Sequence, residues 1–305
     1  MPKNHRKYLA RLRGQFVECV IATNCSIRLL PLLLSDRPGT PLRLLCVMAF
    51  DTWHTLRFGS CLPPDRARTL CSFLDFAACA NAAVDYKSFR PADFERFQEQ
   101  LEATGIREFI GDYLRRLYDI EQQRPSPCGV EHQFETVRRY REAVVRLSMG
   151  AVRSVACGHQ NLDDLTCQTD DDEGPEILFR IVMLCQIIDD VADYSNDLSL
   201  HLPSFLTSHR SLTQAINLTQ NAVREYSCPR PLTGSNPYFP FRLALAAVSA
   251  FTQVTLKAIR CRNHFSRWVP WSQPISAPLI ATQQLSGECG PRCPNKLSPR
   301  IISTD

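Results

Sequence analysis

The sequence predicts an all-α protein, a single large antiparallel helical bundle, and three observations lead to this prediction. Apolar residues recur at intervals of three and four through most of the chain, which is the spacing of one face of a helix. No stretch keeps the alternation of apolar and polar residues that is typical of a half-buried strand. Turn-forming residues fall between the periodic segments. A chain of 305 residues with 44% hydrophobic content is long enough to bury one large core.

The expected helices follow one another with mostly short connections. Pro64 and Pro91 stand at the starts of two helices, where a residue without an N–H costs nothing, whereas Pro31 is a potential break inside the first. From Ser266 onward the composition changes to Pro, Ser, Gln and Gly. We therefore expect residues 1–265 to form the helical domain and residues 266–305 to form a poorly ordered tail. The expected helices are Arg6–Leu34, Pro41–Phe58, Pro64–Val84, Pro91–Thr104, Ile106–Gln122, Glu131–Cys157, Pro175–Asn196, Leu212–Tyr226 and Phe239–Cys261.

Charge and cysteine content narrow the class of protein. The net charge of +4 and the pI of about 8.4 are too mild to indicate a nucleic-acid partner. The fourteen cysteines are scattered, many of them through apolar helical segments. This distribution predicts reduced thiols in a cytoplasmic protein rather than a disulfide framework. The basic start of the chain, from Pro2 to Arg13, lacks the pattern of a signal peptide.

Contact with a membrane is an alternative that two segments leave open. The segment from Phe241 to Ile259 is apolar but contains Arg242 and Lys257, so we interpret it first as the last core helix and second as a membrane anchor. The basic N-terminal arm is either a solvated terminus or a segment that lies on anionic lipid. Peripheral membrane association of a cytoplasmic protein is therefore left open, and so is a homodimer.

Carboxylates interrupt an otherwise apolar helical segment between Ile177 and Tyr194. Asp189 and Asp193 are one turn apart and share a face. Like charges this close repel each other unless a cation lies between them, and Mg²⁺ takes one or two protein carboxylates together with water and substrate phosphates. The pattern therefore predicts a Mg²⁺ site for a diphosphate substrate, with a solvated helix end as the alternative. A ladder of oxygen donors also follows one face at spacings of four, three and four residues: Gln186, Asp190, Asp193 and Asp197.

These residues carry a family resemblance. The segment Gln186-Ile-Ile-Asp-Asp-Val-Ala-Asp193 resembles the second aspartate-rich motif, Q-x-x-D-D-x-x-D, of trans-prenyl diphosphate synthases. The segment Asp197-Leu-Ser-Leu-His-Leu-Pro-Ser-Phe205 is similar to the region that follows the second acidic motif in squalene and phytoene synthases. Both groups have the class I isoprenoid synthase fold, an all-α bundle. The resemblance implies this fold, and it implies a first acidic motif on an earlier helix that faces the second.

The best match to a first motif is Asn81-Ala-Ala-Val-Asp85, in which Asn81 and Asp85 are separated by one helical turn. The match departs from the D-D-x-x-D of prenyl synthases and the D-x-x-x-D of squalene and phytoene synthases, because Asn81 stands where an aspartate is expected. An asparagine carbonyl is able to ligate Mg²⁺ but adds no charge. From spacing alone, an exposed polar face near the end of the helix is the alternative.

A diphosphate leaving group needs cationic partners as well as metal ions. Arg139 and Arg146 are seven residues apart on one face of the helix expected at 131–157, and the guanidinium fork fits phosphate. A solvated basic face is the alternative. Lys87 follows Asp85 in the region where prenyl synthases have basic residues after their first motif.

The sequence thus predicts a Mg²⁺-dependent class I isoprenoid synthase that ionises an allylic prenyl diphosphate and transfers or condenses the prenyl cation. A terpene cyclase of the same fold is one alternative, although the N-x-x-x-S-x-x-x-E pattern of such cyclases is absent. A non-catalytic homologue that binds a prenyl lipid or a partner is the other. The expected catalytic residues are Asp85, Asp189, Asp190 and Asp193; the expected Mg²⁺ ligands are these four with Asn81 and Asp197; and the expected substrate-binding residues are Gln186, Lys87, Arg139, Arg146 and Tyr194.

Overall fold

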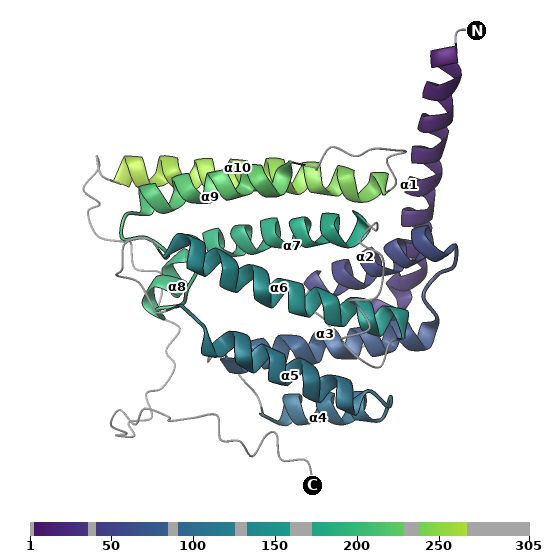
Figure 1. The fold of residues 1–305 in the computed structure, drawn as a ribbon, viewed down its shortest axis with the longest axis horizontal. Helices are drawn as coiled ribbons and strands as arrows, with labels where there is room; N and C mark the ends of the chain where they lie inside the picture. The colour runs from purple at the N-terminus through teal and green to yellow at the C-terminus, as the bar shows by residue number, and fades with distance from the viewer. Residues whose placement is uncertain are drawn as a thin grey trace, which may run out of the picture. The chain divides into compact units, whose positions relative to one another are not determined.

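The computed structural model describes residues 3–35, 41–84, 91–125, 133–158, 173–228 and 238–266. The chain separates into two units, residues 1–260 and 261–305. The first unit holds all the helices described below up to Arg260, and of the second the structure describes residues 261–266, which continue the last helix. Every regular element in these ranges is a helix (Figure 1), so the all-α prediction is confirmed.

The helices follow the sequence prediction closely. Two of them, α2 and α3, have the predicted bounds, and α1 continues past Pro31 instead of breaking there. The largest difference lies in the segment predicted as one helix from Pro175 to Asn196, which is divided at Asp193. The helices are α1 (Lys3–Ser35), α2 (Pro41–Phe58), α3 (Pro64–Val84), α4 (Pro91–Glu102), α5 (Arg107–Gln122), α6 (Phe134–Cys157), α7 (Glu173–Ala192), α8 (Tyr194–Ser199), α9 (Leu212–Ser227) and α10 (Phe239–Ser266).

The core forms around α6, which packs against α2, α3, α5 and α7. The large side chains of the core are fully buried, and burying each of them stabilises the fold by about 1.5–3 kcal/mol. Aromatic rings contact each other edge to face within the core; Phe73 of α3, for example, packs against Phe109 and Tyr113 of α5. The core therefore joins helices from both halves of the sequence. Its bulkiest members include Trp53, Phe73, Phe76, Phe109, Tyr113, Met183, Leu184 and Ile187.

Two long-range contacts show the direction of the central helices. Arg66, near the start of α3, donates to the carbonyl oxygen of Cys157, the last residue of α6, at 3.1 Å. Arg141, in the first half of α6, donates to Asp190 near the end of α7. Both α3 and α7 therefore run antiparallel to α6. Their C-terminal ends lie at the same end of the bundle, which is the left side of Figure 1.

One helix of the described part, α10, is long and apolar enough over Phe239–Arg262 to cross a membrane. One of its faces joins the core through Phe241, Leu245 and Leu256, as expected for the last core helix. The other face is open, with Leu243, Phe251 and Val254 more than half exposed. The membrane anchor therefore stays a prediction, and length and apolarity alone do not distinguish it from a core helix.

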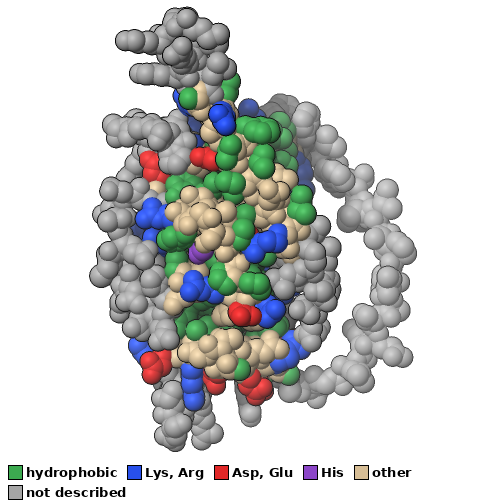
Figure 2. Space-filling view, turned by 90° about the vertical axis from the view of Figure 1, so that its right-hand side faces the viewer, with side chains coloured by type: hydrophobic (Ala, Val, Ile, Leu, Met, Phe, Trp, Pro, Cys, Tyr) green, Lys and Arg blue, Asp and Glu red, His purple; other side chains and the backbone are tan. Residues whose placement is uncertain are grey.

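The surface of the described part mixes apolar and charged groups. In the view of Figure 2, hydrophobic side chains lie among scattered basic and acidic ones. Among the described side chains of α1, five large apolar ones are exposed: Leu12, Phe16, Val17, Val20 and Ile27. Together with the open face of α10, they leave membrane contact and homodimerisation as predictions.

Replacing Gly174 by alanine tests the packing at the start of α7. An added Cβ would lie 2.6 Å from Cδ1 of the fully buried Trp53 and 3.2 Å from Cζ of Tyr238. We expect Gly174→Ala to lower the free energy of unfolding by about 1–3 kcal/mol, because rings packed on all sides do not move aside. Urea denaturation measures the change.

In α5, Gly111 has nothing within 4 Å of its added Cβ, so Gly111→Ala should instead raise the free energy of unfolding by about 0.4–1 kcal/mol. Equal effects of the two substitutions would contradict this packing.

Candidate functional site

The aspartate-rich segment lies where α7 ends and α8 begins. Asp193, the residue between the two helices, has φ −94° and ψ 7°, so the backbone leaves the helical path at this residue. The amide of Asp197 still donates to the carbonyl of Asp193, and Leu202 then donates to the carbonyl of Asp197 at 2.8 Å. The continuous helix predicted through Asn196 is therefore wrong at this one residue, and the oxygen ladder bends there.

Asp190 of α7 faces inward and connects α7 to α6 and to the chain around Phe205. Its side chain is 2% exposed. One carboxylate oxygen accepts from the amide of Phe205 at 2.6 Å, and the other accepts from Nη2 of Arg141 at 3.3 Å. Burial raises the pKa of Asp190 to about 6, against the opposing effects of Arg141 and the Phe205 amide. In this arrangement Asp190 holds the chain after α8 against α7; its role as a metal ligand stays a prediction.

Arg141 is the cation that the structure places at the aspartates. Besides contacting Asp190, it donates through Nη1 to Oε1 of Gln186 at 3.3 Å. Sequence reasoning did not select it over the neighbouring arginines. A signal was available: Arg141 interrupts a buried stripe of α6 at helical spacing, formed by Phe134, Val137 and Val145. A cation inside an apolar stripe requires a buried partner.

Asp189 and Asp193 are the carboxylates that reach the surface. Asp189 is exposed and Asp193 is half-buried, whereas Asp197 is 3% exposed. Gln186, one turn before Asp190, is half-buried. The accessible carboxylates therefore come from the last turn of α7, at Asp189, and from the residue that follows the helix, Asp193. Two carboxylates, both hard oxygen ligands, suit Mg²⁺.

The other predicted substrate-binding residues on α6 and α8 are placed differently. Arg146 lies over the ring of Phe179 at 3.8 Å and pairs with Glu176, so it faces the first half of α7. This position is about 15 Å along the helix axis from Asp189, and the structure does not bring the two together. Arg139 is exposed on α6. Tyr194 opens α8 half-buried and packs against the core.

The first acidic motif is described only in part. Asn81 is exposed in the last turn of α3, at the same end of the bundle as the aspartates of α7. Asp85 and Lys87 lie outside the described residues. Earlier on α3, Phe73 packs against Phe109 of α5, and Phe76 packs against Phe94 of α4.

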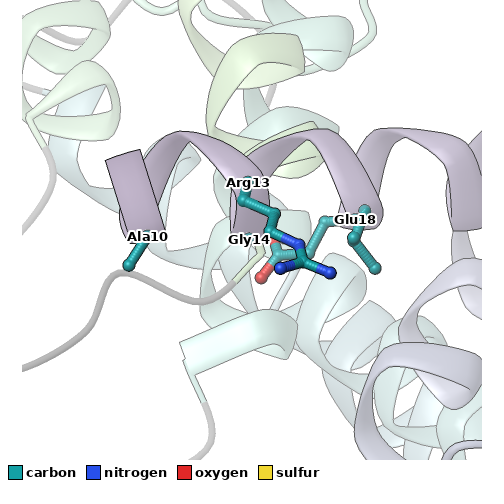
Figure 3. A pocket seen from close by; sticks show the side chains of 5 residues that line it. Ala10, Arg13, Gly14 and Glu18 are labelled. Atoms are coloured by element: carbon teal, nitrogen blue, oxygen red, sulfur yellow. The ribbon is translucent and has the colours of Figure 1, made fainter. Parts of the chain in front are cut away.

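Two other features lie away from the aspartates. A hollow of about 650 Å³ opens on α1 (Figure 3), lined by Ala10, Arg13, Gly14, Val17 and Glu18. In the described part of the chain, the set of three potential metal ligands that converges within 4.8 Å is Cys25, Asp51 and Cys61, not the aspartates of α7. The aspartates would thus need water and substrate oxygens to complete a metal site, as Mg²⁺ sites do.

Comparison with known proteins gives no relative: no protein family, no curated protein and no solved structure matches the chain.

Proposed function

We propose that the chain is a Mg²⁺-dependent enzyme of the class I isoprenoid synthase type, which ionises an allylic prenyl diphosphate and transfers or condenses the resulting prenyl cation. One observation carries the proposal. The C-terminal ends of α3, which carries Asn81, and of α7, which carries Asp189, lie at the same end of the bundle, where Arg141 is bound to Gln186 and Asp190 of α7. Carboxylates, an amide oxygen and a guanidinium at one end of the bundle are groups that a metal–diphosphate cluster uses.

In this proposal Asp189 and Asp193 bind Mg²⁺ directly, because they are the accessible carboxylates of the motif. Asp85, Asn81 and Asp197 are the further proposed ligands. Bound Mg²⁺ would neutralise the charge that develops on the diphosphate as its C–O bond breaks. Asp190 would fix the position of Arg141 and of the chain around Phe205, and so hold the site in shape.

Two of the proposed substrate contacts, Gln186 and Tyr194, lie close to the aspartates along the chain. Arg141 of α6 donates to the side-chain oxygen of Gln186. This contact would orient the amide group of Gln186 next to the aspartates. Tyr194 stands at the start of α8, one residue after Asp193. Lys87 and Arg139 remain proposed diphosphate contacts, whereas Arg146 pairs with Glu176 away from the aspartates and takes no part in this proposal.

Two alternatives keep the same fold. A terpene cyclase would use the same metal–diphosphate cluster but would close the prenyl cation on its own double bonds. A non-catalytic homologue would bind a prenyl lipid or a partner. Two features favour it: Asn81 stands in the first motif, and both carboxylate oxygens of Asp190 already accept hydrogen bonds, from Arg141 and from the amide of Phe205. Location in the cytoplasm with peripheral membrane contact is proposed for each of them.

Incubating the purified full chain with geranyl, farnesyl and geranylgeranyl diphosphate, with and without Mg²⁺, tests the proposal. We expect an organic-soluble product that forms only with Mg²⁺. A product with more carbon atoms than its substrate indicates transfer or condensation, and a cyclic product of the same size indicates a cyclase. Mg²⁺-enhanced binding without turnover supports the non-catalytic homologue, and the absence of both binding and turnover with all three substrates contradicts the proposal.

A further inference from the structure

A second cluster of metal-ligating side chains lies far from the aspartates in sequence and on different helices. Cys25 comes from α1, Asp51 from α2, and Cys61 from the turn between α2 and α3. Their Sγ and carboxylate oxygen atoms all lie within 4.8 Å of one another. Because Zn–S bonds are about 2.3 Å long, two thiolates on one Zn²⁺ lie about 3.8 Å apart, which fits this spacing.

The carboxylate of Asp51 supplies independent evidence for a ligand at this position. Asp51 is fully buried. Its Oδ1 accepts from Nη2 of Arg28 at 2.8 Å and from the amide of Leu62 at 2.7 Å, whereas its Oδ2 is buried without a hydrogen-bond partner. A buried carboxylate oxygen without a partner is costly, and its lone pairs are available to a cation.

The turn that carries Cys61 is held in place by its surroundings. Gly59 adopts φ +72°, a conformation that glycine accepts without strain, and its amide closes the end of α2 on the carbonyl of Thr55. The ring of His54 bonds the carbonyl of Ser60 through Nδ1 at 2.7 Å, and Asp51 holds the amide of Leu62. Cys61 is thus fixed on both sides, next to the buried Cys25.

We propose that Cys25, Asp51 and Cys61 form a binding site for one Zn²⁺ ion, with a fourth position on the solvent side that water fills. Two sulfurs and one oxygen are a zinc donor set, whereas Mg²⁺ prefers oxygen alone, so the site is distinct from the proposed Mg²⁺ site. Zn²⁺ together with the Arg28 guanidinium balances the charge of two thiolates and one carboxylate. The ion would tie α1, α2 and the turn before α3 together.

Co²⁺ and Zn²⁺ titrations of the reduced, metal-free full chain test the proposal. We expect one Zn²⁺ per chain by elemental analysis, and a Co²⁺ form with the sulfur-to-cobalt charge-transfer absorption of tetrahedral thiolate ligation. Loss of a residue that only supports a metal ligand weakens metal binding by about 10- to 100-fold. Cys61→Ser and Cys25→Ser each remove a ligand, so each should weaken Zn²⁺ binding by more than this. Asp51→Asn should weaken it as well, since its one carbonyl oxygen stays on Arg28 and Leu62.

The control is Cys228→Ser, which removes an exposed thiol outside the cluster and should leave Zn²⁺ binding unchanged. Cys61 is also exposed, so Cys61→Ser should keep the circular dichroism spectrum of the wild type. If Cys25→Ser or Asp51→Asn unfolds, the Zn²⁺ affinity of Cys61→Ser still tests the site. Zn²⁺ affinity that changes less than threefold in Cys61→Ser would overturn the proposal. A Cys25–Cys61 disulfide in the chain purified with Zn²⁺ and reductant would overturn it as well.

Discussion

Replacing Asp189 or Asp193 by alanine should lower the turnover of an allylic diphosphate by about 100- to 1,000-fold, the range that loss of one preorganised stabilising group costs an enzyme. Both carboxylates are accessible at the end of α7, and neither is among the fully buried polar groups of the fold. Their loss should therefore remove metal ligands without unfolding the chain. The turnover number measured at saturating Mg²⁺ and substrate gives the effect.

Glu99→Ala is the matched control, because Glu99 is an exposed acid on α4 and lies outside the proposed site. It should keep wild-type turnover, and all three variants should keep the wild-type circular dichroism spectrum. Turnover in Asp189→Ala and Asp193→Ala that equals the turnover of Glu99→Ala would remove both aspartates from the mechanism.

Asp190→Ala should act on stability rather than on metal binding alone, with an expected loss of about 3–5 kcal/mol in the free energy of unfolding. Asp190 is buried, and its removal leaves the Phe205 amide without its acceptor and takes a carboxylate from Arg141. Urea denaturation followed by circular dichroism measures the loss. Asp190→Asn keeps one acceptor oxygen and should lose less. A loss below about 1 kcal/mol in Asp190→Ala would contradict the connecting role that we assign to this carboxylate.

Local sequence signals predicted most of the helices because they act within a few residues. The helix at Pro64–Val84 begins at a proline, which suits the first helical position, and the preceding helix ends before Gly59, whose positive φ closes it. The break at Asp193 could not be predicted in this way. Helical spacing continues through Asp193 to Asp197 and gives no sign that the backbone leaves the helix at Asp193.

The candidate sites show the same limit. Spacing identified Asp189 and Asp193 as one face of a helix, but it could not show that Asp190 accepts a hydrogen bond from the amide of Phe205, fifteen residues later. Nor could it select Arg141, whose partners lie on another helix. The proposed zinc ligands are separated by 26 and 10 residues on three elements, and only tertiary packing brings them together. Sequence periodicity predicts which residues share a face, and packing decides which faces meet.

We propose that this chain ionises an allylic diphosphate with Mg²⁺ bound at Asp189 and Asp193. The most direct measurement is the release of inorganic pyrophosphate from farnesyl diphosphate by the wild type and by Asp189→Asn, with and without Mg²⁺. We predict release by the wild type that requires Mg²⁺ and is nearly lost in the variant. Release that is independent of Mg²⁺, or equal in the two proteins, would contradict the claim.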